Sequence, residues 1–238
     1  MVNRINIRHY LQSLLFLLSV NLFAQENIIT AGFQYKPIFP SKFLNNGFEI
    51  AQNNVGFSIQ SSYGFCAGMS IRRGITSLIS FESGINYVKR KYQLSITDGS
   101  FKGESEFNII GYEIPALGLV FIPITKNIFM DVGLGASIDM FPSSIVYSSD
   151  TYFRQLSSRK SWLLTGVLAN VGYEFRTSNY GYFYLGASYH YPFNPIYNTN
   201  VNYEINNSNN SIESKLQGDY FTLDCRYFFH ANVIKKKR

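Results

Sequence analysis

The stretch Ile128–Met140 reads IFMDVGLGASIDM, and its residues alternate between two chemical classes. Every second side chain from Met130 to Met140 is apolar, whereas the positions between them hold two aspartates, two glycines and a serine. A period of two predicts a β-strand with one apolar and one polar face. The polar face carries carboxylates and glycines, so we expect it to face the lumen of a narrow barrel while the apolar face meets lipid.

Seven further stretches alternate in the same way, which brings the predicted count to eight strands. The predicted strands are Ile28–Pro37, Phe57–Arg72, Ser77–Lys91, Glu106–Phe121, Ile128–Met140, Ser161–Arg176, Tyr182–Tyr191 and Gly218–Phe229. Their connections alternate between long polar loops and short turns, which is typical of outer-membrane barrels. The sequence therefore predicts an all-β fold, an eight-stranded antiparallel up-and-down transmembrane β-barrel.

Pro115 interrupts the fourth predicted strand. Because proline cannot donate to a ladder and a closed barrel has no free edge, we expect a β-bulge at this position. The bulge would reverse the facing of the residues that follow, so that Leu117 and Leu119 meet lipid and Gly118 faces the lumen.

The composition favours a membrane barrel over a soluble domain. Aromatic residues make up 17% of the chain and charged residues only 15%, against about 25% charged residues in a typical soluble domain. The formal net charge of +6 comes from Arg4, Arg8 and four basic residues at 235–238. Because no basic stripe runs through the body of the chain, we expect no nucleic-acid binding.

The chain begins with a segment that resembles an export signal. Arg4 and Arg8 precede the apolar run LLFLLSV at 14–20, and Ala24 fits a cleavage site, so residues 1–24 are predicted to be a signal peptide. The run is shorter than the ~20 residues of a spanning helix. We expect residues 25–229 to form one barrel domain and residues 230–238 a basic C-terminal tail.

The inward positions of the predicted strands carry nearly balanced charges. The acids are Glu82, Glu113, Asp131, Asp139, Glu174 and Asp224, and the bases are Lys36, Arg72, Arg90, Arg176 and Arg226. An eight-stranded barrel is just wide enough for side chains to fill it, and unpaired charges there are costly. We therefore expect a structural ion-pair network that plugs the lumen, and a substrate path or proton relay is the alternative. The network residues are predicted to be Arg72, Glu82, Glu113, Asp131, Asp139, Glu174, Asp224 and Arg226.

The sequence offers little catalytic chemistry. Ser188 and His190 share one predicted strand face, in the reverse order of the His-x-Ser pair of lipid A deacylase barrels, and their spacing of ~7 Å is too long for a hydrogen bond. Cys66 and Cys225 are predicted to face opposite ways on strands separated by a third strand, as free thiols. We predict no metal site, because two distant cysteines and one usable histidine cannot form a structural zinc site. We also predict no catalytic residue and no cofactor.

Aromatic residues also occur in two predicted loops. They are Phe39, Phe43 and Phe48 in the first long loop, and Phe141, Tyr147, Tyr152 and Phe153 in the third. Exposed aromatic side chains on a rigid barrel either bind a partner protein or glycan, or pack on one another to cover the lumen. Both interpretations stay open from the sequence.

Five segments together resemble the PorT-like outer-membrane β-barrel domain family. They are ITAGFQYKPIFPS (29–41), YEIPALGLVF (112–121), MDVGLGASIDM (130–140), YLGASYHY (184–191) and GDYFTLDCRYFF (218–229). The resemblance implies an outer-membrane location in contact with lipid and, for some members, a part in protein secretion or envelope assembly. One departure is that Phe229 is followed by nine residues, HANVIKKKR, whereas such barrels usually end at a terminal aromatic residue.

The predicted function is that of a small outer-membrane barrel with a plugged lumen, which acts as a structural or interaction protein through its long outer loops. Two alternatives stay open: one shares the outer-membrane location of the predicted barrel, and the other shares its eight strands. A lipid A-modifying hydrolase would use Ser188 and His190. A soluble lipocalin-like ligand-binding barrel would place its apolar residues inward, which the nearly charge-free outward face of the last four predicted strands argues against.

Overall fold

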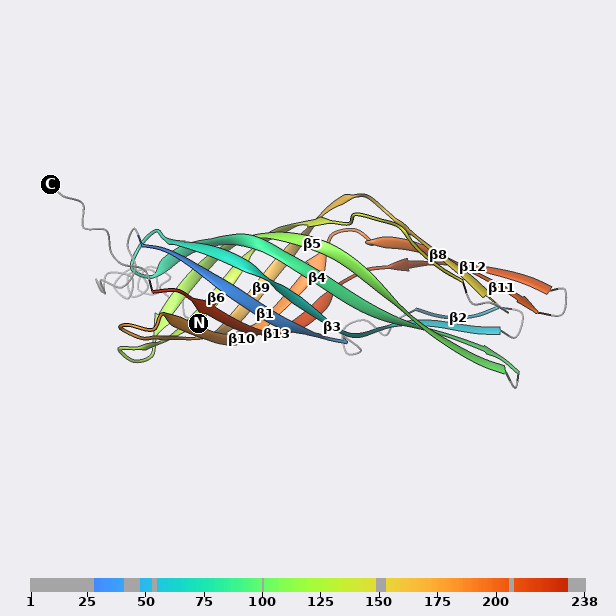
Figure 1. Ribbon diagram of the computed structural model, residues 1–238, viewed down its shortest axis with the longest axis horizontal. Coiled ribbons are helices and arrows are strands. Elements are labelled where there is room, and N and C mark those ends of the chain that lie inside the picture. The colour runs from blue at the N-terminus through green and yellow to red at the C-terminus, as the bar shows by residue number, and fades with distance from the viewer. Residues whose placement is uncertain are drawn as a thin grey trace, which may run out of the picture.

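A computed structural model describes residues 28–40, 48–52, 55–99, 101–148, 153–205 and 208–230. These residues form thirteen strands in two sheets, and none of their segments is a helix long and apolar enough to cross a membrane. The molecule is elongated, with a barrel at one end and a second β-layered unit at the other (Figure 1). The predicted signal peptide and residues 231–238 of the predicted tail lie outside the described residues.

Eight strands close the barrel. They are β1 (Ile29–Phe39), β3 (Val55–Gly74), β4 (Ile79–Asp98), β5 (Phe101–Pro123), β6 (Ile128–Met140), β9 (Leu163–Arg176), β10 (Tyr182–Pro192) and β13 (Tyr220–Phe228). All their pairings are antiparallel, and the sheet closes because β1 pairs with both β13 and β3. The predicted eight-stranded antiparallel barrel is confirmed, and β6 has the predicted bounds.

The outer wall of the barrel is apolar and the inner wall is polar. On β6, Leu134 is 66% exposed, whereas Asp131 and Asp139 are at most 1% exposed. The same alternation continues around the wall, where the exposed apolar side chains include Met69, Ile71, Ile85, Val120, Val132, Ile138, Val171, Leu185 and Leu223. This facing is the one that lipid requires. It excludes the lipocalin-like alternative, which needs the opposite arrangement.

Aromatic rings border the apolar wall in two groups. Near the end with the short turns, which we call the turn end, Phe33 and Tyr227 both contact Phe229 edge-on, at 5.5 and 5.4 Å between ring centroids. Toward the opposite end, Phe65 lies 5.8 Å from Tyr87, which in turn lies 6.0 Å from Tyr112. Two such belts are expected at the two interfaces between lipid and water.

β5 passes through Pro115 without a bulge. Its pairing with β6 keeps one register over 112–123, and its pairing with β4 resumes in the same register on either side of the proline. Leu117 and Leu119 are 4% and 0% exposed, and Gly118 faces outward. The predicted bulge and reversal are therefore wrong. The missing N–H of proline interrupts one ladder but does not insert a residue, so the alternation continues.

The two cysteines are free, as predicted. Cys66 on β3 is buried and Cys225 on β13 is exposed. β1 lies between these two strands, so the thiols are separated by a strand and lie on opposite faces of the wall.

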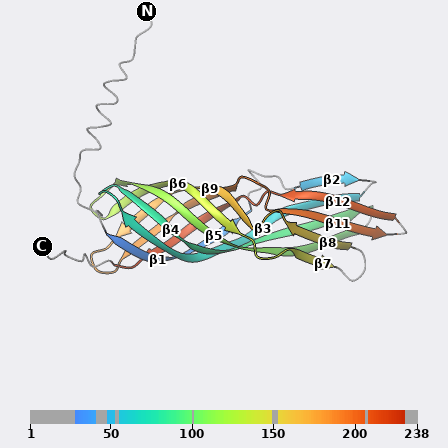
Figure 2. The ribbon, with the colours of Figure 1, turned by 90° about the horizontal axis from the view of Figure 1, so that it is seen from above.

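Above the barrel, the long connections form a second β-layered unit, which we call the cap. One layer consists of the far ends of β3, β4 and β5 with β2 (Phe48–Gln52), and β4 and β5 extend well beyond their predicted bounds. The other is a four-stranded sheet in the order β12-β11-β8-β7, formed by β7 (Ile145–Ser148), β8 (Phe153–Arg159), β11 (Tyr197–Ile205) and β12 (Ser208–Leu216). Both project from the same end of the barrel (Figure 2). The prediction of long loops there is therefore wrong, because much of each connection is strand.

The interior of the cap combines an apolar cluster with a few buried polar side chains of the four-stranded sheet, namely Gln155, Ser157, Thr199 and Ser214. Its buried cluster includes Phe57, Ile59, Leu94, Ile96, Phe107, Ile109, Val201, Ile212 and Leu216. β3 runs through both the barrel wall and the cap, and its register shifts between Ser62 and Phe65. As a result, Phe57 faces the cap interior and is 3% exposed, whereas Tyr63, also at an odd-numbered position, faces outward and is 66% exposed. A bulge of this kind changes which face a side chain occupies.

Of the loop aromatics, Phe141 packs inward. It is 1% exposed and meets Tyr197 edge-on at 5.6 Å, so for this residue the interpretation as a cover over the lumen is confirmed. Phe39 is 37% exposed. Phe43 and Tyr152, together with the side chains of Phe48, Tyr147 and Phe153, lie outside the described part of the chain.

We expect Leu134→Arg to destabilise the folded protein in liposomes by about 2–4 kcal/mol, because an arginine near the bilayer midplane is costly. Urea unfolding of the inserted barrel measures this. Leu156→Arg is the matched control, since Leu156 is 40% exposed on the cap and a surface change there should alter stability by about 0.5 kcal/mol or less. Equal effects of the two changes would contradict the assignment of the outer wall to lipid.

Candidate functional site

Two arginines and three carboxylates form a continuous chain of ion pairs in the barrel lumen. Arg72 pairs with Glu82, at 2.9 Å between Nη2 and Oε2, and with Glu174 on the far side. Arg226 pairs with the other oxygen of Glu82 at 2.9 Å and with Asp224 at 2.5 Å. All five side chains are at most 2% exposed. Because β3 and β9 are not neighbours in the sheet, the chain of ion pairs joins opposite walls of the barrel.

Further cations and hydroxyls complete the charge balance. Arg176 donates to Glu174 at 2.7 Å, and Lys36 lies 3.5 Å from Asp224. Asp224 also accepts hydrogen bonds from Ser188 at 2.5 Å and from Thr222 at 2.6 Å. A buried carboxylate with this many donors has its lost hydration replaced by the protein.

Aromatic rings fill the lumen at the turn end. The Arg176 guanidinium lies 3.8 Å from the centroid of the Phe129 ring and 4.6 Å from that of Phe121. The Arg72 guanidinium lies 4.0 Å from the centroid of Phe228. Cation–π contacts of this kind are strengthened by desolvation, so these rings both close the end of the barrel and stabilise its cations.

Two glycines leave room for the ring of Tyr184 in the lumen. Gly172 and Gly186 are paired across β9 and β10, and a Cβ at either position would come within 2.6 Å of Cζ of Tyr184. Tyr184 in turn lies under the Arg226 guanidinium, at 4.5 Å. Close approach is a common reason for glycine within a strand, and here it lets the ring lie across the bore.

The predicted network residues separate into three groups. Arg72, Glu82, Glu174, Asp224 and Arg226 form the chain of ion pairs described above. Asp131 is buried at the same level, but neither of its carboxylate oxygens accepts a hydrogen bond from a described residue. Glu113 and Asp139 lie elsewhere, beside His190 near the cap end. The sequence pattern placed all eight inside the barrel but did not show that they lie at different heights along the barrel axis.

His190 is surrounded by polar groups that the sequence did not associate with it. Its Nε2 lies 3.0 Å from Ser137 Oγ, 3.0 Å from Asp139 Oδ2 and 3.7 Å from Glu113 Oε2. Its ring stacks on Tyr220 at 4.7 Å between centroids. The prediction of no metal site counted only histidines and cysteines, and it missed this buried histidine between two carboxylates.

The arrangement does not match a serine hydrolase. Ser188 donates to Asp224 rather than lying against His190. Ser137 does contact His190, but it and Asp139 approach the same ring nitrogen, Nε2. In a catalytic triad the acid orients the imidazole through the opposite nitrogen, and His190 Nδ1 has no hydrogen-bond partner among the described residues.

The cap closes the lumen at its other end. The Arg90 guanidinium lies 4.8 Å from the ring centroid of Tyr220 and 5.5 Å from that of Phe141, and the apolar cluster of the cap follows directly. In the cap, Tyr92 stacks on Phe107 at 5.5 Å, and burial raises the pKa of Tyr92 to about 12. The side chains therefore change from charged to apolar before they reach the tip of the molecule.

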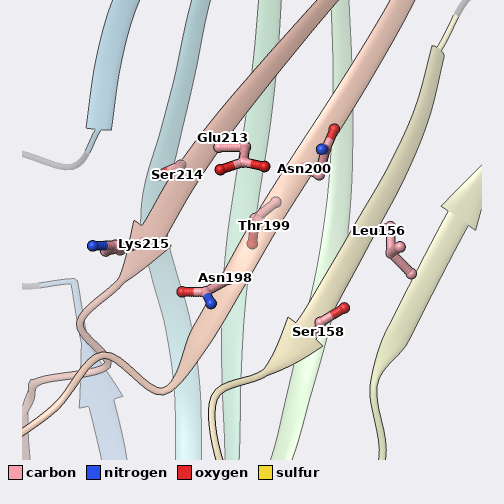
Figure 3. Close-up of a pocket in the computed structure, with 8 residues that line it drawn as sticks. All are labelled: Leu156, Ser158, Asn198, Thr199, Asn200, Glu213, Ser214 and Lys215. Carbon is pink, nitrogen blue, oxygen red and sulfur yellow. The ribbon is translucent and has the colours of Figure 1, made fainter.

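The outer face of the four-stranded cap sheet is polar and slightly hollow. A depression of about 490 Å³ is lined by side chains from β8, β11 and β12, which Figure 3 shows on the sheet surface. The exposed lining residues are Leu156, Ser158, Asn198, Glu213 and Lys215. Amide, hydroxyl and charged groups on a rigid sheet can form hydrogen bonds with a protein or glycan surface.

The fold is also found in a solved outer-membrane protein. The outer membrane protein OprG from Pseudomonas aeruginosa aligns with a TM-score of 0.54 and 12% identity, over 87% of this chain and 98% of that one. The translocator domain of the autotransporter NalP from Neisseria meningitidis aligns over 94% of this chain and 95% of its own, with 12% identity and a TM-score of 0.36. The β domain of the Bordetella autotransporter BrkA gives 7% identity and 0.33, over 87% of this chain and 100% of its own.

Of these three alignments, that with OprG is close enough to define a shared fold, and at 12% identity it shows the fold alone. No protein-family model matches the sequence, and no curated protein does. Together with the apolar outer wall, the comparison places this chain in the structural class of the eight-stranded outer-membrane β-barrels.

We expect Glu82→Gln to destabilise the barrel by about 3–5 kcal/mol, because it removes the carboxylate shared by Arg72 and Arg226 and leaves both cations underpaired in a buried site. Urea unfolding in micelles or liposomes measures the change. Glu106→Gln is the matched control: Glu106 pairs with Lys91 at 2.5 Å but is 52% exposed, so its loss should cost about 1 kcal/mol or less. If both variants unfold at the same urea concentration, the lumen ion pairs do not hold the barrel together.

Proposed function

We propose that this protein is a structural or interaction barrel of the outer membrane, with a lumen closed by its own side chains. The observation that carries the proposal is the continuous filling of the bore. Aromatic rings occupy the turn end, ion pairs occupy the middle and the apolar cap occupies the far end. Transport through the lumen would require breaking buried ion pairs, each of which is costly to disrupt.

The second part of the proposal is that the protein is not an enzyme. Two observations support this. Ser188 donates to Asp224 rather than contacting His190, and Ser137 and Asp139 both approach the same nitrogen of His190, Nε2. Lipid A hydrolysis by the purified barrel that disappears in Ser188→Ala would contradict it.

The third part concerns partners, which we infer to be other proteins of the envelope. The resemblance to PorT-like barrels supports a role in protein secretion or envelope assembly. The ordered cap supports contact through the far end, because its strands hold the polar outer face in one shape and little entropy would be lost on binding.

Purified protein in planar lipid bilayers should give no stable conductance steps, because side chains fill the bore from end to end. A general porin in the same bilayers is the positive control, since its water-filled channel conducts. Reproducible ohmic steps from the folded protein would contradict the proposal of a closed lumen. Migration on gels with and without heating verifies that the reconstituted protein is folded.

We expect Glu213→Lys to weaken co-purification of an envelope protein with this barrel after mild solubilisation, because it reverses a charge in the depression of the cap sheet. Glu104→Lys is the matched control. Glu104 is an exposed glutamate on the other cap layer, where it pairs with Lys102 at 2.7 Å. The same partner should be recovered at wild-type level with that variant. Recovery that is equal for wild type and Glu213→Lys would argue against this face as the contact surface.

A further inference from the structure

Three potential metal ligands meet inside the barrel near the cap. Glu113 of β5, Asp139 of β6 and His190 of β10 are all buried, and one ligand atom from each lies within 4.8 Å of the other two. Glu113 and Asp139 are directly opposite each other in the ladder between β5 and β6. His190 is on β10, which is separated from β6 by β9, so its side chain reaches the two carboxylates from another part of the wall.

We propose that these three side chains bind one divalent metal ion, and we take Zn²⁺ as the reference ion. Imidazole nitrogen and carboxylate oxygen are normal zinc donors, with bonds of about 2.0–2.2 Å, which places tetrahedral donors roughly 3.4 Å apart. The distances from His190 Nε2 to Asp139 Oδ2 and Glu113 Oε2 are 3.0 and 3.7 Å. These two distances lie on either side of that spacing, and all three ligand atoms lie within 4.8 Å of one another.

The surroundings of Asp139 favour cation binding. Its side chain is 2% exposed, yet neither carboxylate oxygen accepts a hydrogen bond from a described residue. The nearby Arg90 guanidinium lies over the rings of Tyr220 and Phe141. Its Nε and Nη2 make no hydrogen bond with a described residue. His190 Nε2 is the polar atom beside this carboxylate, at 3.0 Å from Oδ2. A buried carboxylate that accepts no hydrogen bond is strongly disfavoured, and a cation bound between Asp139 and His190 would supply that compensation.

Neighbouring residues orient the other two ligands. Tyr220 donates to Glu113 Oε2 at 2.5 Å, and Asn86 donates to Glu113 Oε1 at 2.9 Å. The Tyr220 ring also stacks on His190, with 22° between the planes. Outer partners that hold metal ligands in place are a regular part of such sites. Ser137 Oγ, at 3.0 Å from His190 Nε2, is positioned to be the fourth donor or to hold a water molecule there.

The site is enclosed beneath Phe141 and the cap, so the ion would enter as the barrel forms. The experiment therefore starts from the full chain unfolded in urea with chelator and refolds it into micelles with Zn²⁺ or Co²⁺. After removal of free metal, elemental analysis gives the metal content and gel migration without heating gives the folded fraction. We expect about one Zn²⁺ per folded chain, and the visible d–d bands of tetrahedral Co²⁺ in the cobalt-loaded protein.

Substitutions locate the ion. His190→Ala and Asp139→Asn should each lower the metal content of the folded fraction by about tenfold or more, since even the loss of an outer-shell partner often costs that much affinity. Asp131→Asn is the matched control, because Asp131 is an equally buried carboxylate with both oxygens unpartnered but lies away from the histidine. It should leave the metal content unchanged.

Either of two results of the metal analysis would overturn the proposal. One is folded wild-type protein that retains neither Zn²⁺ nor Co²⁺. The other is metal retention that is the same in wild type, His190→Ala and Asp139→Asn. If a variant does not fold, the cobalt spectrum of the wild-type protein decides alone, because octahedral or absent bands would also contradict the predicted coordination.

Discussion

Pairing of charges across the lumen is the interaction on which the rest of this structure depends. The outer wall faces lipid, so charged side chains can lie only inside, and an eight-stranded bore is too narrow to hydrate them fully. Glu82 meets this constraint by accepting from both Arg72 and Arg226. The Arg72–Glu82 pair joins neighbouring strands, whereas Arg226–Glu82 and Arg72–Glu174 join strands that are not adjacent, so these two hold opposite walls together as well as neutralising charge.

The chemistry of the interior changes in steps along the axis, and each step has a structural cause. Rings at the turn end lie over Arg176 and Arg72, and the shared carboxylates follow. The group around His190 comes next, and above it the register shift in β3 turns apolar side chains inward to form the cap. A single strand can therefore face lipid with one set of residues and pack in the buried cluster of the cap with another.

Alternation was sufficient to predict the barrel because lipid on one side and a filled lumen on the other select side chains at every second position. It predicted β6 from end to end and placed all eight network residues inward. It failed at Pro115, where a general expectation about proline outweighed an alternation that in fact continued. Alternation also missed the cap strands. An Asn-rich segment such as 202–210 resembles a solvent-exposed loop, and two inward apolar residues, Ile212 and Leu216, are too few to reveal the alternation of a strand.

The group around His190 was missed for a different reason. Glu113, Asp139 and His190 were each expected to face inward, but facing does not say how far along the axis a residue lies. That height depends on strand register, which single-strand patterns do not contain. The ladder between β5 and β6 pairs Glu113 with Asp139, and only the folded barrel brings His190 within 3.0 Å of Asp139 and 3.7 Å of Glu113.

Phe141 shows why the barrel and the cap act as one unit. It follows β6 directly, its ring lies under the Arg90 guanidinium, and the same ring packs edge-on against Tyr197 of β11. Arg159 of β8 donates to the Phe141 carbonyl at 2.8 Å. The residue that covers the lumen is thus also part of the cap core, so opening the bore would require disrupting the cap. This link between barrel and cap supports the proposed role, in which the protein presents the outer face of its cap and passes no solute through its centre.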